Sequence, residues 1–428
     1  MLQNYNTDDN WISKALNWSK QFKAFNILVS NANDSAYSMY EFILFAGCKD
    51  AIRTASNDKE SLSKLDTFVK RHSGSWITGY LTYELKDEVE PVKNLKDRSI
   101  TDSKLHFFIP EIIIYKLEGK IHIEADNPEQ ILSEIQDYAP LLPSQDVIPP
   151  FKPRISKQEY LSSFNQLKNY IAKGDLYQAN FCQEFYRSDI KLNDLESLYF
   201  KLTKNAPSPF SCFFKYESLY VLSASPERYF KKKCNQIISQ PIKGTAPRDQ
   251  DLQKDLELKE QLLKNIKERS ENLMVVDLVR NDLSKISIPG TVNRTKNLQV
   301  QSYSHVHQLV STVQGELPPN TSLGEILGAT FPPGSMTGTP KKRALEIIEE
   351  LESSNRGVYS GSIGYQTPWG DMDFNVVIRT LIYDRTKEYL SFHVGGGITQ
   401  LSDGEKEYEE CLIKASTLLD TLDTCIQK

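Results

Sequence analysis

The sequence of 428 residues predicts an α+β fold with largely antiparallel sheets. Segments with the pattern of strands and segments with the pattern of helices do not alternate strictly, as they would in a parallel α/β fold. Two apolar segments, 372–384 and 388–398, predict a hairpin that turns at about 384–388. Hydrophobic residues make up 39% of the chain and charged residues 25%, which is typical of a globular protein.

The first part of the chain predicts strands. The segments 25–30 and 75–85 are apolar or alternate between apolar and polar residues. The segment 105–125 predicts a strand, a turn at Gly119 and a second strand. We therefore expect this part of the chain to supply strands to a sheet.

A proline-rich segment, 139–153, divides the chain into an N-terminal part, 1–138, and a C-terminal part, 154–428. Five of its fifteen residues are proline. Proline fixes φ and cannot continue a hydrogen-bonded ladder, so the segment predicts an extended linker. The chain contains no internal repeat and no low-complexity tract.

Helices and strands are both predicted after the linker. Residues 156–174 begin with a serine N-cap, show helical apolar spacing and end in glycine, which predicts a helix. The segments 219–225 and 235–240 predict two strands paired across a basic turn. Residues 249–283 predict one long helical stretch, and 402–422 predict a final amphipathic helix.

Charge and composition exclude several classes of protein. The chain has 51 Lys plus Arg against 56 Asp plus Glu, so a protein built mainly to hold nucleic acid or an anionic membrane is excluded. Apolar runs such as 111–115 are too short to span a bilayer. The polar, acidic N-terminus does not have the pattern of a leader, and six scattered cysteines do not make a disulfide framework. We therefore expect a cytoplasmic protein.

Histidine is too rare to favour a zinc site. Only His305 and His307, among six histidines, are close in sequence. Any bound metal would therefore be held by carboxylates, and these favour a hard ion such as Mg²⁺.

A lysine between a strand and a glycine is the first candidate for chemistry. Lys243 is followed by Gly244 and Thr245, and glycine lets a backbone approach a ligand closely. A desolvated lysine can lose its proton and act as a nucleophile. Glu227 ends the preceding strand, sixteen residues earlier. A surface lysine at a turn and a solvated carboxylate remain the simpler interpretation of these two residues.

Two pairs of glutamates have helical spacing. Glu268 and Glu271 are three residues apart on one predicted helix, and Glu407 and Glu410 are three apart on another. Two such faces opposed would offer carboxylate oxygens to Mg²⁺, which retains waters and also takes substrate oxygens. Spacing alone favours ordinary solvated helix faces.

Two further segments could bind an anion. A glycine- and threonine-rich segment, 334–340, precedes a helix that opens at about Lys341, and the N–H groups at a helix N-terminus bind anions. Three glycines, 395–397, follow a predicted strand, and Arg379 lies on the neighbouring strand. Its guanidinium could bind a carboxylate through two hydrogen bonds, or form a structural salt bridge.

These segments occur together, in an order that resembles the chorismate-utilising enzymes related to anthranilate synthase component I. Ordered motifs run from about 171 to 414, among them SASPERYF, PIKGT, SENLMVVDLVRNDL, GVYSGSIGYQ, GGGIT and EYEECLIKA. The resemblance implies two large, mostly antiparallel β-sheets packed as a sandwich with helices outside. It also implies that 1–138 and 154–428 interleave in one composite body.

Three positions distinguish the branches of this family. The anthranilate branch has alanine where this chain has Lys243, and that lysine marks the aminodeoxychorismate branch. Isochorismate and salicylate synthases have a lysine base where this chain has Gln178. Anthranilate synthases have histidine where it has Gln308. These residues favour an aminodeoxychorismate synthase component I, in para-aminobenzoate and folate biosynthesis. An anthranilate synthase and a catalytically silent chorismate-binding subunit are the alternatives.

The resemblance also implies roles for individual residues. Lys243 would be the nucleophile and Glu227 the general acid, while Glu271 and Glu410 would hold Mg²⁺, with Glu407 acting through a water. Ammonia is expected from a separate glutamine amidotransferase subunit. The positions that match chorismate contacts are Gly244, Thr245, Thr337, Tyr365, Arg379, Gly395, Gly396 and Gly397.

A regulatory tryptophan pocket is only partly matched. Tryptophan-inhibited relatives have an LLES-type motif, where this chain has ILVSN with Ser30 but no glutamate after the leucine. The second part of that pocket, Pro207, Ser208 and Pro209, is present. Whether tryptophan binds is left open by these residues.

Overall fold

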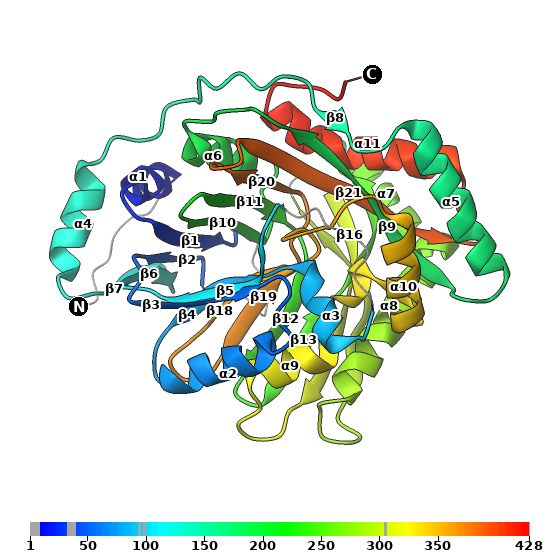
Figure 1. Cartoon of the computed structure of the whole chain (residues 1–428), viewed down its shortest axis with the longest axis horizontal. Helices are drawn as coiled ribbons and strands as arrows, with labels where there is room; N and C mark the ends of the chain where they lie inside the picture. Colours follow the sequence, from blue (N-terminus) through cyan, green and yellow to red (C-terminus); the bar gives the residue numbers. More distant parts are fainter. Residues whose placement is uncertain (1–8, 32–39, 93–95, 97–99, 304–305, 428) are drawn as a thin grey trace.

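A computed structural model describes residues 9–31, 40–92, 96, 100–303 and 306–427. Two large sheets, called sheet A and sheet B here, face each other with helices outside them (Figure 1). Every pairing between strands within the sheets is antiparallel, as in Ile27 opposite Phe213 and Gly79 opposite Gly364. The predicted α+β sandwich of antiparallel sheets is confirmed.

Sheet A has eleven strands and sheet B has ten. Sheet A consists, in spatial order, of β17 (Gly338–Thr339), β9 (Gln178–Arg187), β21 (Tyr389–Thr399), β20 (Thr380–Asp384), β11 (Leu219–Ser225), β10 (Phe210–Tyr216), β1 (Ala24–Val29), β2 (Phe42–Ala46), β6 (Ile112–Leu117) and β7 (Lys120–Glu124), with β8 (Lys152–Pro153) beside β9. Sheet B consists of β14 (Ile242–Pro247), β16 (Val306–Glu316), β13 (Gln236–Gln240), β12 (Arg228–Lys233), β19 (Met372–Asn375), β18 (Ser362–Gln366), β4 (Ile77–Leu81), β5 (Ser103–Ile109) and β3 (Asp50–Ala55), with β15 (Asn293–Ser302) beside β16.

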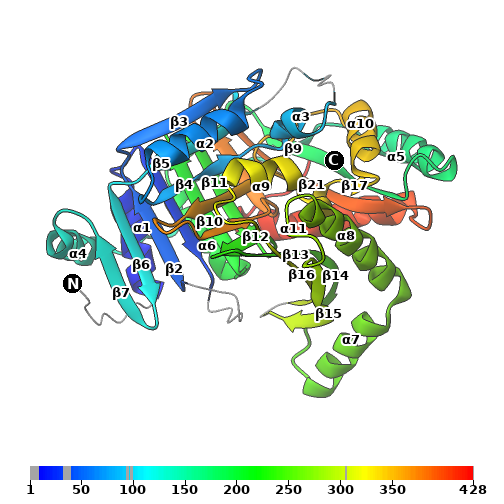
Figure 2. The ribbon, with the colours of Figure 1, turned by 90° about the horizontal axis from the view of Figure 1, so that it is seen from below.

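Helices cover the outer faces of the two sheets. Sheet A is covered by helices that include α5 and α11, while α7 and α8 pack on the β14–β16 end of sheet B. Figure 2 shows α7 and β15 projecting from the body beside α8. The helices are α1 (Asp9–Ser19), α2 (Ser61–Arg71), α3 (Lys86–Val89), α4 (Pro128–Asp137), α5 (Lys157–Ala172), α6 (Leu195–Asn205), α7 (Leu252–Lys264), α8 (Ile266–Ser284), α9 (Leu323–Thr330), α10 (Lys341–Leu351) and α11 (Gly404–Thr421), with short 3₁₀ turns at Tyr83–Leu85 and Gly334–Met336.

The core lies between the sheets and under the outer helices. One buried apolar cluster joins residues of both sheets, such as Phe45 and Val221 of sheet A with Phe107 and Ile363 of sheet B. A second cluster lies beneath the helices on sheet A. Removal of this apolar surface from water is the main force that holds the layers together.

Both sheets contain strands from both sides of the proline-rich segment. Strands β1, β2, β6 and β7 of sheet A and β3, β4 and β5 of sheet B precede residue 139. Residues 141–150 form neither helix nor strand, and the chain runs along the outside of the body from α4 to β8 (Figure 1). The part of the chain before residue 139 therefore supplies both edge strands and interior strands to the two sheets, and the later part supplies the remaining strands.

Several predicted elements are confirmed at the level of their caps and turns. Helix α5 begins with a capping box, in which the Ser156 side chain accepts a hydrogen bond from the Glu159 N–H and the Glu159 side chain accepts one from the Ser156 N–H. Strands β20 and β21 form the predicted hairpin, with Asp384 opposite Tyr389. Helices α10 and α11 begin at Lys341 and Gly404, close to the predicted starts.

Three predictions of local structure were wrong. The stretch 249–283 is two helices, because Asn265 leaves the helical conformation and caps α8 by accepting a hydrogen bond from the Glu268 N–H. The basic segment 228–233 is a strand, β12, so 219–225 and 235–240 belong to different sheets and do not pair. The segment 105–125 contains three strands, because it breaks between 109 and 112, where Pro110 offers no N–H to the ladder.

Candidate functional site

A cavity of about 710 Å³ lies where β14 and β21 meet helices α8 and α11. Its deep end contains Glu227, which is 4% exposed. Its walls also include the exposed Lys267 and Ile413, and these mark the side open to solvent. The predicted site residues that line the cavity are Glu227, Lys243, Gly244, Thr245, Glu268, Glu271, Arg379, Gly395, Gly396, Gly397, Glu407, Glu410, Pro207, Ser208 and Pro209.

Lys243 lies at an irregularity in β14. Ile242 is opposite Val310 and Thr245 is opposite Gln308, so Lys243 and Gly244 together face one residue of β16. A bulge of this kind redirects a side chain away from the regular alternation of a strand. Gly244 has φ of +88°, and a Cβ there would lie 3.0 Å from Oε2 of Glu268. Glycine therefore allows both the bulge and the close approach of α8.

The glycine triplet lies inside β21, and not after a strand as predicted. A Cβ on Gly397 would lie 2.3 Å from Nε2 of Gln178 and 3.5 Å from Nζ of Lys243. A Cβ on Gly396 would lie 3.1 Å from Oε2 of Glu407. The bare backbone of β21 therefore leaves space for the Lys243 amine and for a carboxylate of α11.

Glu227 has the environment of a carboxylic acid that keeps its proton. It lies between β11 and β12, and burial raises its pKa to about 7 against the lowering effects of Ser335, Lys243 and the Ile242 N–H. A carboxyl group with a pKa near neutrality can donate a proton to a leaving group at physiological pH.

The four predicted glutamates converge on one side of the cavity. The pKa of Glu271 is raised to about 7, mainly by burial; Lys243 and Lys267 act to lower it, and Glu268 and Glu407 act to raise it. Burial also raises the pKa of Glu268. For Glu410, burial would raise the pKa, but Lys414, Lys267 and Lys243 outweigh it and lower the value. The carboxylates are thus close enough to affect one another.

Two lysines stand among these carboxylates. Nζ of Lys267 lies 3.8 Å from Oε1 of Glu271 and 3.7 Å from Oε1 of Glu407. Nζ of Lys414 lies 2.7 Å from Oε1 of Glu410 and donates to the Gly395 carbonyl. The ammonium groups of these two lysines therefore lie among the carboxylates of α8 and α11.

The donor set suits a hard cation. Oε1 of Glu271 is buried and has no hydrogen-bond partner within the part of the chain that the structure describes. Every predicted ligand supplies carboxylate oxygen, the type that Mg²⁺ prefers. Over the described part of the chain, no three acidic, histidine or cysteine side chains are grouped closely enough to hold an ion as they stand. Lys267, whose side chain is 43% exposed, is the cation that these oxygens face in this structure. The assignment of Glu271, Glu407 and Glu410 as ligands stays a prediction.

Arg379 faces the cavity from a strained backbone position. It precedes β20 with φ of +51°, and so does not lie on a strand as predicted. Burial lowers its pKa, against the raising effect of Tyr303, another residue of the cavity wall. Within the described residues it forms no salt bridge, so the structural ion pair considered as an alternative is not made.

Two predicted substrate contacts lie outside the cavity. Thr337 is 1% exposed, and its Oγ1 donates to the carbonyl of Gly334. Tyr365 lines a separate pocket of about 50 Å³ that also contains Ser30 and Pro209. The side chains of Thr337 and Tyr365 are therefore not brought to the cavity that holds Lys243.

Sequence patterns missed several residues of the cavity wall. Tyr359 lies six residues before Tyr365, and its ring stacks on His393 with 5.2 Å between centroids. Gln308, named from the sequence only as a position that distinguishes the branches, also lines the cavity, and its buried Oε1 has no hydrogen-bond partner among the described residues. Residues two apart on a strand lie on the same face, so His393 of β21 could have been inferred from the predicted site residue Gly395. No local signal in the sequence points to Tyr359.

The predicted tryptophan pocket is divided between two spaces. Ser30 lies in the 50 Å³ pocket, Pro207 and Ser208 line the large cavity, and Pro209 borders both. Whether tryptophan binds stays an open prediction.

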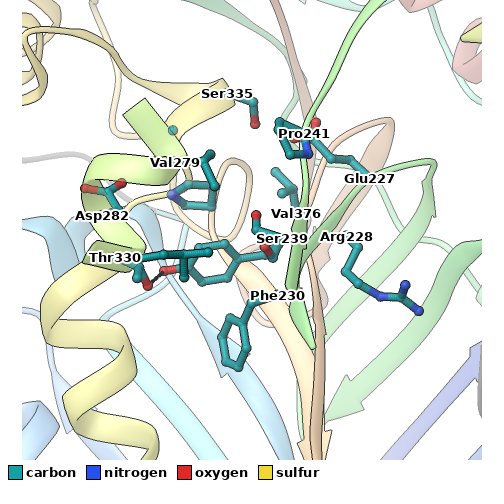
Figure 3. A pocket seen from close by; sticks show the side chains of 14 residues that line it. Glu227, Arg228, Phe230, Ser239, Pro241, Val279, Asp282, Thr330, Ser335 and Val376 are labelled. Carbon is teal, nitrogen blue, oxygen red and sulfur yellow. Dashed lines mark hydrogen bonds between the residues drawn. The ribbon is translucent and has the colours of Figure 1, made fainter. Parts of the chain in front are cut away.

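A smaller cavity, separate from the 50 Å³ pocket, lies behind Glu227. It has a free volume of about 20 Å³, and Glu227 and Ser335 belong to its wall and to that of the large cavity. Figure 3 shows Glu227 and Ser335 on one side of this space and Asp282 of α8 on the other. The two cavities therefore meet at the predicted general acid.

None of the described helices is both long enough and apolar enough to cross a membrane.

Comparison with known proteins gives a consistent result. A family model described as chorismate binding enzyme matches residues 23–420. Anthranilate synthase component 1 of Saccharolobus solfataricus is 35% identical over 344 residues, covering 80% of this chain and 79% of that relative. Aminodeoxychorismate synthase component 1 of Klebsiella aerogenes is 37% identical over 303 residues, covering 70% of this chain and 66% of that relative. The crystal structure of anthranilate synthase component I from Streptococcus pneumoniae has a TM-score of 0.78 at 28% identity, covering 90% of this chain and 93% of that one.

Proposed function

The chain belongs to the chorismate-binding enzyme family, and we propose that its reaction is the transfer of ammonia to chorismate, giving 4-amino-4-deoxychorismate. The observation that supports this most directly is the position of Lys243. Its amine lies against Gly397 in the same cavity as Glu227, and the anthranilate branch that this chain otherwise resembles has alanine there. A lysine in this place suits covalent catalysis.

In the proposed first step, the neutral Lys243 amine attacks C2 of chorismate. The C4–O bond breaks as Glu227 donates its proton to the departing hydroxyl, which leaves as water. The raised pKa of Glu227, about 7, supports its role as the acid. The result is a covalent adduct between the lysine and the ring, with Glu227 as a carboxylate.

In the proposed second step, ammonia attacks C4 and the bond between C2 and the Lys243 nitrogen breaks. The lysine leaves as a neutral amine, and a proton from the new ammonium group returns to Glu227. Both residues are then restored. Two displacements replace one that is more difficult, and the adduct keeps water from the reactive ring.

Binding of chorismate is assigned to the charged and glycine-rich walls. Arg379 suits a substrate carboxylate, because it is half-buried in the cavity wall and forms no salt bridge with the described residues. Gly244, Thr245 and the triplet 395–397 offer backbone at close approach. Glu271 and Glu410 would hold Mg²⁺, with Glu407 acting through a water, and the ion when bound neutralises a ring carboxylate and withdraws electrons from the ring.

The ammonia is proposed to come from a separate glutamine amidotransferase subunit, with free ammonia as a poorer substitute. Under this proposal the enzyme works in the cytoplasm, in para-aminobenzoate and folate biosynthesis. Anthranilate synthesis is the second candidate, because the Saccharolobus solfataricus relative is about as similar as the Klebsiella aerogenes one. A catalytically silent subunit is disfavoured by Glu227, Lys243 and Glu271 lining one cavity.

The assignment is tested by incubating the protein with chorismate, Mg²⁺ and ammonium. We expect a product that an added aminodeoxychorismate lyase converts to 4-aminobenzoate. Formation of anthranilate without that lyase would replace the assignment by anthranilate synthase. Binding of chorismate without turnover, under conditions in which a control aminodeoxychorismate synthase is active, would indicate the silent subunit.

A further inference from the structure

We propose that the small cavity behind Glu227 holds one small neutral molecule, ammonia or water, which exchanges with the chorismate cavity past Glu227 and Ser335. The inference rests on the proposed function, since it assigns a place to the ammonia that enters and to the water that leaves. It concerns a space that the roles of Lys243 and Glu227 do not themselves use.

The size and wall of the cavity suit such a molecule. A buried water requires roughly 10–15 Å³ of free volume, and about 20 Å³ is present. Among the described residues, the buried Oγ of Ser335 has no hydrogen-bond partner of regular geometry, although Ser335 is close enough to Glu227 to lower the pKa of that carboxyl group. A buried hydroxyl in this state is stabilised by a guest that bonds to it.

The charges around the cavity favour a neutral guest. Asp282 is the second carboxylate of the wall, and its two oxygens are taken by Lys285 at 3.0 Å and by Lys341 at 2.6 Å. An ammonium ion would therefore meet two lysine ammonium groups beside this carboxylate. Apolar side chains, among them Val279 and Val376, form much of the remaining wall.

The position of Glu227 explains why the reaction would use this space. The exposed residues Lys267 and Ile413 mark the open side of the large cavity, while Glu227 lies at its deep end. A chorismate ring bound between the open side and the deep end of the large cavity would separate its C4 and Glu227 from solvent. The water formed from the C4 hydroxyl, and the ammonia that attacks C4, then need a space on the far side of the ring. The small cavity is such a space.

The test fills the cavity without touching Glu227 or Ser335. Val376→Ile adds a methyl group to the wall, and Val377→Ile is the matched control, since Val377 is equally buried and does not line the cavity. Val279→Ile fills the space from α8 and serves if Val376→Ile does not fold. Three quantities are measured: the KM for ammonium, the KM for chorismate, and the rate at which the Lys243 adduct forms when ammonia is absent.

If the guest is ammonia, the filled variants should raise the KM for ammonium about tenfold, or ~1.4 kcal/mol, with the chorismate KM unchanged. If the guest is water, adduct formation should slow by a similar factor while the KM for ammonium stays constant. A crystal structure of the wild type should show one ordered molecule that is absent from Val376→Ile.

An empty cavity in the wild type, or filled variants that match Val377→Ile in all three quantities, would overturn the inference. Failure of the wild type to make aminodeoxychorismate would overturn the proposed function, and the two failures are distinguishable.

Discussion

Lys267 of α8 and Glu407 of α11 form an ion pair across the cavity, with 3.7 Å between Nζ and Oε1. The same ammonium lies 3.8 Å from Oε1 of Glu271, an oxygen that has no hydrogen-bond partner. The two helices are therefore joined by charge at the place where the family resemblance puts a metal. A Mg²⁺ at that place would compete with the Lys267 ammonium for the same carboxylate oxygens.

We expect Glu271→Gln to weaken Mg²⁺ binding by at least about tenfold, because it removes one of few anionic oxygens, and Mg²⁺ depends on these. Calorimetric titration with Mg²⁺ in the absence of chorismate measures the effect. Glu260→Gln is the control, since Glu260 lies on α7 in an exposed pair with Lys264. Equal Mg²⁺ affinity in the two variants would remove Glu271 from the metal site.

Lys243→Ala should reduce kcat by roughly a thousandfold or more, because the covalent route depends on its amine. Intact-protein mass spectrometry of the wild type, quenched during turnover with ammonia withheld, should show an adduct that the variant lacks. The thermal midpoint should change little, because Lys243 lies in the wall of a cavity and not in the packed core. A variant with wild-type rate would refute the nucleophile.

Adduct formation should slow as pH rises above about 7, because Glu227 must be protonated to act as the acid and its pKa is raised to about 7. Glu227→Gln should abolish this dependence along with most of the rate. The raised pKa also makes the free energy of unfolding depend on pH. It should fall as pH rises from the unfolded pKa of a glutamate, about 4.3, to the folded pKa of Glu227, because the unfolded carboxyl group ionises more easily than the buried one. Chemical unfolding should show that the free energy of unfolding of Glu227→Gln, relative to that of the wild type, is higher at pH 8 than at pH 5.

Gly397→Ala should reduce activity more than tenfold, since the new Cβ would lie 2.3 Å from Nε2 of Gln178, which must then shift beside the Lys243 amine, itself 3.5 Å from that Cβ. Gly328→Ala is the control: it lies in α9, its Cβ meets only Leu62 at 3.8 Å, and alanine is the better helix former. Steady-state kinetics and thermal midpoints distinguish loss of the site from loss of the fold. Full activity in Gly397→Ala would mean that the contact at Gly397 is not needed.

Tyr359→Phe should raise the KM for chorismate about tenfold or more, because Tyr359 lines the cavity, whereas Tyr365→Phe should leave it unchanged. Loss of one hydrogen bond to a charged ligand is worth about 1.5–3 kcal/mol. Each variant removes one tyrosine hydroxyl, so the comparison differs only in which of the two positions is changed. The reverse result would restore Tyr365 as the substrate contact.

The sequence was most informative where local signals act alone. The serine cap and the spacing of α5, and the hairpin of β20 and β21, depend on neighbours within a few residues. Strand β12 was missed because its basic residues resemble a solvated turn. Arg228 is buried there by an ion pair with Asp373 of β19, and no local pattern reveals a partner 145 residues away.

The same distinction applies to the site. Lys243, Glu227 and the four glutamates were identified by motifs and do line one cavity. Tyr365 was assigned from the family resemblance, and Tyr359, which lies six residues earlier in the same glycine-rich segment, was not considered. Only the packing of β18 against β4 and β19, in sheet B, shows that Tyr365 points into a different pocket.

The interleaving of the sheets has a consequence for synthesis of the chain. Phe25 of β1 pairs with Lys215 of β10, so the ribosome must add about 190 residues before β1 gains that neighbour. At about 5–20 residues per second this takes roughly 10–40 s. During that interval one edge of β1 is open to pairing with other chains, and β4 waits still longer for β18. Until its last third has been made, a nascent chain of this design exposes strand edges of both sheets that could pair with other chains.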